Sequence, residues 1–566
     1  MNIKKVTYFV ILPCVAFLAG LMPAAFAQPP DIGQITKEVD RPFREEAQKE
    51  MQAPPEKPKI VEEEEKKPEA PAVTFFAKKI LLEGTESFPP EEFRSLIEKY
   101  ENKKISINDL SILSDEIERE YLRRGIITAC FVPPQEIRDG VVKLQVVEAK
   151  MGSLHVNDHK YFDKDMVKFY WTIKQNQILR YDKMSKSLYL MNKNADRTVK
   201  ATLHAGDKPR TTDVTLDVDT RFPIHPTGSF DNEGTVSSGI ARWGVGLRHN
   251  NFLFVDDILL LGYSFGKHFL GIYGYHSVPI TNFGTSIMYG YSYSQSSPKK
   301  EFGSFGLESE ARTTSFFVHQ DVFQNGSYRG EIYTGFEAKD KNTDIYQGAI
   351  NRDRLRILTF GSNMIHEYPG AVTYMNPEFT QGINGFGARS RSPLSSRQAS
   401  NTFSIFNLNI NHTRSLPVFD LRAVAKFKGQ IASEILPPQE EFSLGGINSV
   451  RGYPSGDFLA DNAFQVNFEI LIPAYFIPEE IKLPFDDGPF KDDITGVVFF
   501  DYGYGQKRGK SQTERPDDSL AGVGVGLRIR AMKFGIVRLE WGFPVGNRPI
   551  TQTAPGRLHV SIDLKY

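Results

Sequence analysis

The stretch RLHVSIDLKY, residues 557–566, alternates apolar and polar side chains up to the last residue of the chain. Its apolar positions are Leu558, Val560, Ile562, Leu564 and Tyr566. Because successive side chains of a strand point to opposite faces, one face of this segment is apolar and the other is polar. The stretch therefore predicts a β-strand that separates an apolar environment from an aqueous one.

The same alternation recurs along the second half of the chain, from about residue 226 onward. VRLEWGF (537–543) and FQVNFEI (464–470) show it clearly, with aromatic residues on the apolar faces. Alternation alone also fits a soluble β-sandwich. The repeat of about ten residues, the aromatic apolar faces and the aromatic last residue favour a transmembrane β-barrel of about 16 antiparallel strands. A barrel of that size encloses an aqueous lumen.

The N-terminus has the pattern of a secretory signal peptide over residues 1–27. Lys4 and Lys5 precede an apolar run, and the small-residue site Ala25-Phe26-Ala27 follows it. Removal of this segment would leave Cys130 as the remaining cysteine, so no intramolecular disulfide is expected.

Residues 28–72 are rich in Pro, Glu and Lys and are expected to form a linker, because they carry too little apolar surface to offset the entropy of ordering. Within them, residues 31–51 are compatible with a helix that Pro42 interrupts.

Two tandem modules are expected between the linker and the barrel, over residues 73–149 and 150–221, with the barrel over residues 222–566. Each shows the order β-α-α-β-β by its apolar periodicity. In the first module, Ser106 and Asp109 predict a capping box at the start of the second helix. Neither module shows a catalytic cluster, so both are interpreted as interaction modules.

A loop of about thirty residues separates the segments 419–429 and 463–473 and contains SVRGYPSGDF (449–458). Loops of this length without regular structure are usually functional or disordered. Its glycines allow tight backbone paths, so a compact hairpin folded into the lumen is expected.

The segment TGVVFFDYGYG (495–505) offers a partner for the single arginine of that loop. Alternation places Phe499, Asp501 and Gly503 on the lumen side. A guanidinium fork matches a carboxylate, so Arg451 and Asp501 are predicted to form an ion pair. The alternative is that Arg451 is solvated in an outer loop and that Asp501 is one of many lumen charges.

These residues carry a resemblance to a known family. Val450, Arg451, Gly452 and Tyr453 in a long late loop, the strand with Phe499, Asp501 and Gly503, the tandem modules and the aromatic end resemble the Omp85 superfamily. With two such modules, called POTRA domains, and a Pro-rich N-terminal segment, the chain looks like a TpsB transporter of two-partner (type V) secretion, of the haemolysin and filamentous-haemagglutinin type (ShlB/FhaC/HecB).

The resemblance implies an outer-membrane pore with its POTRA domains in the periplasm, which recognises an unfolded TpsA-like exoprotein and moves it to the cell surface, with haemolysin secretion and activation as examples. It implies that Arg451 latches onto Asp501 and that residues 31–51 plug the pore. It also implies that Leu564 and Tyr566, where the family usually ends in Phe, form an assembly signal for the barrel-assembly machinery, and that outer-membrane lipid surrounds the barrel.

The sequence contains no phosphate-binding loop, no H-E-x-x-H motif and no convincing nucleophile elbow. The expected function is therefore transport, without an enzyme activity, a cofactor, a metal or a nucleic-acid partner. Six cations at lumen-facing positions are expected either to line a hydrated path or to form structural ion pairs: Arg422, Lys426, Lys428, Arg528, Arg530 and Arg538. The alternatives are an Omp85-type assembly and insertion factor, a general porin and a secreted β-rich protein.

Overall fold

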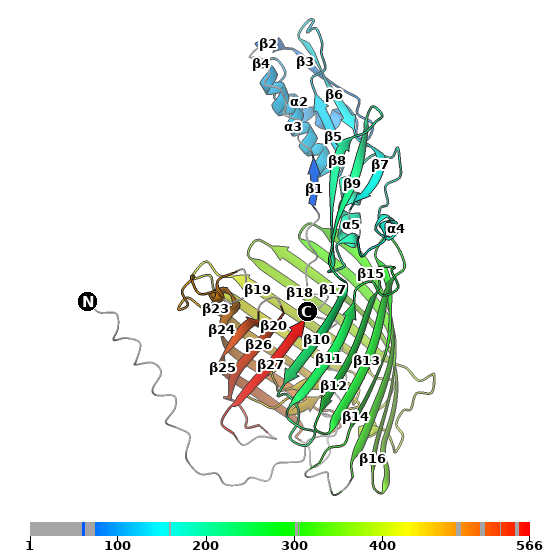
Figure 1. Ribbon diagram of the computed structural model, residues 1–566, viewed down its shortest axis with the longest axis vertical. Coiled ribbons are helices and arrows are strands. Elements are labelled where there is room, and N and C mark those ends of the chain that lie inside the picture. The colour runs from blue at the N-terminus through cyan, green and yellow to red at the C-terminus, as the bar shows by residue number, and fades with distance from the viewer. Residues whose placement is uncertain are drawn as a thin grey trace, which may run out of the picture.

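The computed structural model, shown in Figure 1, describes residues 59–62, 74–157, 160–299, 304, 306–482, 488–509, 515–531, 534–549 and 554–565. The expected signal peptide, the expected plug segment 31–51 and Tyr566 lie outside the described residues. Two small modules stand one above the other on one end of a β-barrel (Figure 1).

Sixteen of the described strands are hydrogen-bonded in one closed ring, in which the last strand, β27, pairs with the first, β10. The strands are β10 (Ile224–Asp231), β11 (Arg242–His249), β12 (Ile258–Gly266), β13 (Phe269–Pro279), β14 (Thr285–Ser296), β15 (Glu308–Asn325), β16 (Tyr328–Ile345), β17 (Gly348–Tyr368), β18 (Ala371–Gly382), β19 (Ser404–Ser415), β20 (Arg422–Ala432), β23 (Asn462–Pro473), β24 (Ile494–Gln506), β25 (Asp517–Ala531), β26 (Gly535–Pro544) and β27 (Arg557–Lys565). The predicted fold class is confirmed.

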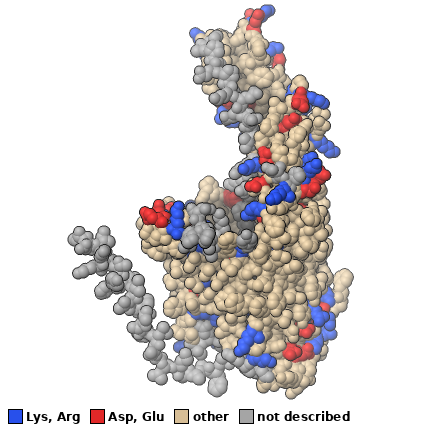
Figure 2. Space-filling model, viewed as in Figure 1, with Lys and Arg blue, Asp and Glu red and all other residues tan. Residues whose placement is uncertain are grey.

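The two faces of the barrel wall differ as the alternation predicts. Trp541 and Leu558 are about half exposed on the outside, whereas Glu540 and His559, next to them in the chain, are buried on the inside. Figure 2 shows that the visible face of the barrel wall is largely uncharged, with charged side chains gathered towards its two ends and on the modules. Such an uncharged face is the surface that a barrel presents to lipid.

The first module packs two helical segments on short strands: β2 (Thr74–Ala77), β3 (Lys79–Glu83), η2 (Pro90–Phe93), α2 (Arg94–Ile97), β4 (Lys103–Ser106), α3 (Ile107–Arg123), β5 (Thr128–Phe131) and β6 (Val141–Glu148). The predicted capping box at Ser106 and Asp109 begins α3. The short strand β4, which pairs with β2, was not predicted, because its four residues show too little apolar pattern to be recognised.

The second module contains β7 (Lys150–Asn157), α4 (Lys164–Phe169), α5 (Tyr181–Met191), β8 (Arg197–Ala205) and β9 (Thr211–Thr220). Its sheet has the order β1-β8-β9-β7, and β1 (Lys59–Glu62) comes from the range expected to be linker. That expectation is therefore wrong for residues 59–62: Ile60 and Val61 are β-branched, and the free edge of β8 supplies the hydrogen bonds that the segment lacks alone.

The second module is fixed to the rim of the barrel by buried polar contacts. Asp256, in the turn between β11 and β12, accepts hydrogen bonds from Tyr170 Oη at 2.7 Å and from Arg197 Nη2 at 2.9 Å. Asn194 Nδ2 donates to the main-chain oxygen of Asn250 at 2.6 Å. These contacts hold the barrel-facing end of β8 against the mouth of the lumen.

Candidate functional site: a latch loop in the barrel lumen

The loop between β20 and β23, residues 433–461, folds back inside the barrel. It contains the short hairpin β21 (Phe442–Leu444) and β22 (Phe458–Ala460). Leu444, Val450 and Tyr453 of this latch loop are fully buried and pack with Leu520 on the inner face of β25. Apolar burial therefore holds the loop on the wall and brings its tip into contact with buried charges.

The structure brings Arg451 and Asp501 together. Arg451 Nε donates to Asp501 Oδ2 at 2.7 Å, and Nη2 donates to Oδ1 at 2.7 Å, which is the two-point geometry of a guanidinium on a carboxylate. The main-chain nitrogen of Arg451 adds a hydrogen bond to Oδ2 at 3.0 Å. Arg451 is 1% exposed and Asp501 is 0% exposed, so the pair is removed from water.

Other residues of β24 and β25 also contact Arg451 or the loop around it. The guanidinium carbon lies 3.6 Å from the centre of the Phe499 ring, as in a cation–π contact. A Cβ at Gly503 would lie 2.7 Å from Leu444, and one at Gly522 on β25 would lie 2.0 Å from the main-chain oxygen of Arg451. The inner wall therefore needs glycine at Gly522, where the loop backbone crosses it, and Gly503 makes room for the Leu444 side chain.

The tip of the latch loop also contacts both sides of the β10–β27 junction. Gly452 has a φ of 96°, a backbone conformation that residues other than glycine rarely adopt. Its nitrogen donates to His559 Nε2 on β27 at 3.0 Å. His559 in turn bonds Glu233, just beyond β10, at 2.6 Å, and Glu233 accepts a hydrogen bond from Ile447 of the loop at 3.0 Å.

Two further carboxylates surround the arginine, and the sequence analysis missed both. Arg451 Nη1 donates to Glu469 Oε1 at 2.7 Å and to Glu540 Oε2 at 2.9 Å. Burial disfavours the charge of the guanidinium, but Asp501 and these two glutamates outweigh that effect and raise the pKa of Arg451. The alternation does place both glutamates on the lumen side, and that parity is the signal that could have indicated them.

Three of the six lumen cations belong to the same cluster. Arg528 bonds Glu469 at 2.9 Å and Glu540 at 2.8 Å, Arg538 bonds Glu540 at 3.2 Å, and Lys426 lies 3.7 Å from Glu469. These three side chains form structural ion pairs. Arg422 and Arg530 are exposed, and Lys428 lies on the same inner face of β20 as Lys426.

A second paired cation, the half-buried Arg397, lies in the loop between β18 and β19 and was not indicated by the sequence. Its guanidinium bonds Asp461 at 3.0 Å and Glu441, both at the base of the latch loop and both fully buried. Arg397 has a φ of 54°, which is uncommon for a residue with a side chain. The pair links two loops at the end of the barrel opposite the modules.

Among the described residues, no group of three or more His, Cys, Asp or Glu side chains is placed to hold a metal ion. No helix in the described part of the chain is both long and apolar enough to cross a membrane. Leu564 lies on the outer face of β27 opposite Gly228 of β10.

Comparison with known proteins gives a consistent result. Residues 210–529 match the family described as haemolysin secretion/activation protein ShlB/FhaC/HecB, and residues 75–149 match the ShlB-type POTRA domain. The outer membrane transporter CdiB of Escherichia coli O6:K15:H31 (strain 536 / UPEC) is 23% identical over 494 residues, covering 84% of this chain and 82% of the relative. The heme/hemopexin transporter protein HuxB of Haemophilus influenzae (strain 86-028NP) is 22% identical over 468 residues, covering 79% of each.

Solved structures show the same fold. CdiB from Escherichia coli superposes with a TM-score of 0.72 at 19% identity, covering 96% of this chain and 100% of that one. BamA from Haemophilus ducreyi lacking POTRA domains 1-3 superposes with a TM-score of 0.56 at 12% identity, covering 87% of this chain and 100% of that one.

The closed barrel and the POTRA match define the class: an outer-membrane β-barrel transporter with its POTRA region in the periplasm. Within that class, the chain belongs to the ShlB/FhaC/HecB family of haemolysin secretion/activation proteins, because the match to that family spans more than half of it.

Proposed function

We propose that this protein exports one unfolded exoprotein, which the POTRA domains hold as an added β-strand and which then crosses the outer membrane through the lumen. The observation that carries the first step is that β8 accepts an added strand: β1 pairs with it in parallel, from Lys59 opposite Lys200 to Glu62 opposite Leu203. Main-chain hydrogen bonds of this kind hold an extended chain without demanding a particular sequence.

Because β1 already pairs with the edge of β8, an exoprotein would have to compete with β1 for that edge. Only four residues form β1, so the ladder that an exoprotein must displace is short. An exoprotein segment that pairs along the whole of β8 would form more hydrogen bonds than β1 does. Substrate binding would then release residues 59–62 from the second POTRA domain.

The latch loop supplies the closed state of the pathway. Because the Arg451 cluster fastens the loop inside the lumen, passage of a polypeptide requires that the loop move or that the chain pass beside it. The latch role of Arg451 and Asp501 is thus a proposal that their buried pairing supports. In the same way, lipid contact along the barrel wall and recognition of the β27 end by the barrel-assembly machinery are proposed from the exposed apolar outer face.

Coexpression tests the proposal directly. The chain is expressed with a large, signal-bearing exoprotein encoded next to it, and the exoprotein is measured at the cell surface and in the periplasm. Export that depends on this chain, with unchanged levels of other outer-membrane barrels, is expected. A loss of other barrels on deletion, with normal export of the neighbouring protein, would instead indicate the assembly factor. The BamA likeness shows shared fold and does not by itself favour that alternative.

A further inference from the structure

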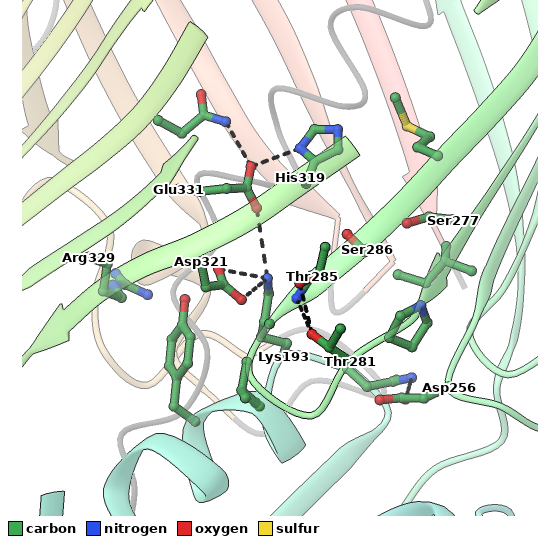
Figure 3. A pocket seen from close by; sticks show the side chains of 18 of the residues that line it. Lys193, Asp256, Ser277, Thr281, Thr285, Ser286, His319, Asp321, Arg329 and Glu331 are labelled. Carbon is green, nitrogen blue, oxygen red and sulfur yellow. Dashed lines mark hydrogen bonds and ion pairs between the residues drawn. The ribbon is translucent and has the colours of Figure 1, made fainter. Parts of the chain in front are cut away.

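A cavity of about 270 Å³ lies at the mouth of the lumen that carries the modules. Its walls come from two parts of the molecule: the end of α5 with the residues after it, and the inner faces of β12 to β17 (Figure 3). It is distinct from the latch-loop site, with which it shares no residue named above.

One side of the cavity carries charged side chains that are paired with one another. Lys193 Nζ, just after α5, lies 2.9 Å from Asp321 and 3.8 Å from Glu331, and His319 Nδ1 lies 3.0 Å from Glu331 (Figure 3). Burial disfavours the ammonium charge, but Asp321 and Glu331 outweigh that effect and raise the pKa of Lys193. These charged groups already contact one another.

The other side is apolar at positions where an aqueous lumen favours polar residues. Ile258, Leu260, Met288 and Ile365 line the cavity, and each is only half-buried. Leu261 of β12 and Tyr289 of β14 are exposed on the outer face, so Ile258, Leu260 and Met288 point inward. Ile365 has the parity opposite to that of the outward-facing Phe360 on β17, so it points inward as well. Their remaining apolar surface is removed from water only when something apolar enters the cavity.

The cavity also lies where a chain bound to the second POTRA domain would enter the barrel. Strand β8 begins at Arg197, four residues after Lys193, and Arg197 is bonded to Asp256, which lines the cavity. The bound strand β1 begins opposite Lys200, at this same end of β8. A strand on the β8 edge advances about 3.3 Å per residue, so a few residues beyond Arg197 bring it to the cavity.

We infer that this cavity is a binding subsite for one apolar or aromatic side chain of an extended polypeptide as it passes from the β8 edge into the lumen. The inference rests on the proposed function. A subsite of this kind gives each passing segment a brief hold without selecting a sequence, since any large apolar side chain in the segment fills it. The charged wall, being paired, tolerates the polar residues on either side.

The test uses single channels of the full-length protein in planar bilayers and two synthetic peptides. Both are unfolded and Ser/Thr-rich, with several Lys residues for uptake; one has a single central Phe where the other has Ser. They are added on the POTRA side, and the dwell time of each current block is measured. Burial of one Phe should lengthen the dwell time by about tenfold or more.

A pair of variants locates the effect. Met288→Ser is expected to remove most of the difference between the peptides. Met364→Ser makes the same chemical change at a position of β17 whose parity is that of the outward-facing Phe360, and it should leave the difference intact. Equal dwell times of the two peptides on the unmodified protein would overturn the subsite and leave the conducting pore standing. If neither peptide blocks the current, the proposed function fails, and the subsite fails with it.

Discussion

Substitution of Arg451 by Ala is the sharpest test of the latch, because the three carboxylates around Arg451 differ in which other cations they contact. Glu469 keeps Arg528 and Lys426, and Glu540 keeps Arg528. Asp501 differs from the two glutamates, because in the described part of the chain Arg451 is the cation paired with it.

Asp501 is fully buried, and among the described residues its remaining side-chain donor would be Asn467 Nδ2, at 2.8 Å. Removing one partner of a buried ion pair typically costs about 3 to 5 kcal/mol. This penalty acts on the docked state of the loop, where Asp501 is covered. It corresponds to an increase of about two to three and a half powers of ten in the population of the undocked loop.

The assay measures how fast a thiol reagent reaches a cysteine placed at a buried position of the loop itself. Val450→Cys is suitable because Val450 is 0% exposed and because Cys130, in the first POTRA domain, is also buried. In this background Arg451→Ala should raise the labelling rate at least about 100-fold, and export should fall while the barrel remains inserted. Arg530→Ala, which removes an exposed lumen cation, serves as the matched control.

The double variant shows whether the unpaired Asp501 carboxylate causes the faster labelling. Adding Asp501→Ala to Arg451→Ala removes the uncompensated charge, so the labelling rate should fall part of the way back towards the parent. An unchanged rate in Arg451→Ala, or a double variant that labels as fast as the single one, would refute the reasoning.

Four other outcomes can be measured. Deletion of residues 59–62 should free the β8 edge and lower the Kd for an extended peptide by at least about fivefold, measured by fluorescence anisotropy; an unchanged Kd would mean that β1 does not compete. Deletion of residues 31–51 should raise single-channel conductance if they occupy the pore, and an equal conductance would count against a plug. Arg397→Ala should lower the temperature at which the barrel unfolds on a heat-modifiability gel by several degrees, since it removes the cation paired with the buried Asp461 and Glu441; no shift would show that the link is not needed. Arg123 helps lower the pKa of Glu120 in α3 from 4.5 to about 2, so the first POTRA domain should lose stability as the pH falls from about 4.5 to about 2, and thermal unfolding that is flat across this window would contradict the shift.

The barrel and the sidedness of its wall follow from the sequence alone. Strand side chains repeat every two residues, so a charged residue such as Asp501 between outward Phe500 and Tyr502 can only face inward. The presence of two small modules also followed, because apolar periodicity and caps such as that at Ser106 are local signals. These features need no knowledge of which segments meet.

The composition of the latch depended on segments that meet only in the folded chain. Arg451 reaches Glu540 across 89 residues of sequence, and Gly452 reaches His559 across 107. The register between strands and the path of the latch loop decide these contacts, and no local sequence pattern predicts either of them. For the same reason the sequence predicts a linker where β1 lies: these four residues become a strand only because the edge of β8 lies beside them. Local periodicity thus determined what each segment is, and tertiary packing alone decided which charges neutralise one another and which surface a passing chain would meet.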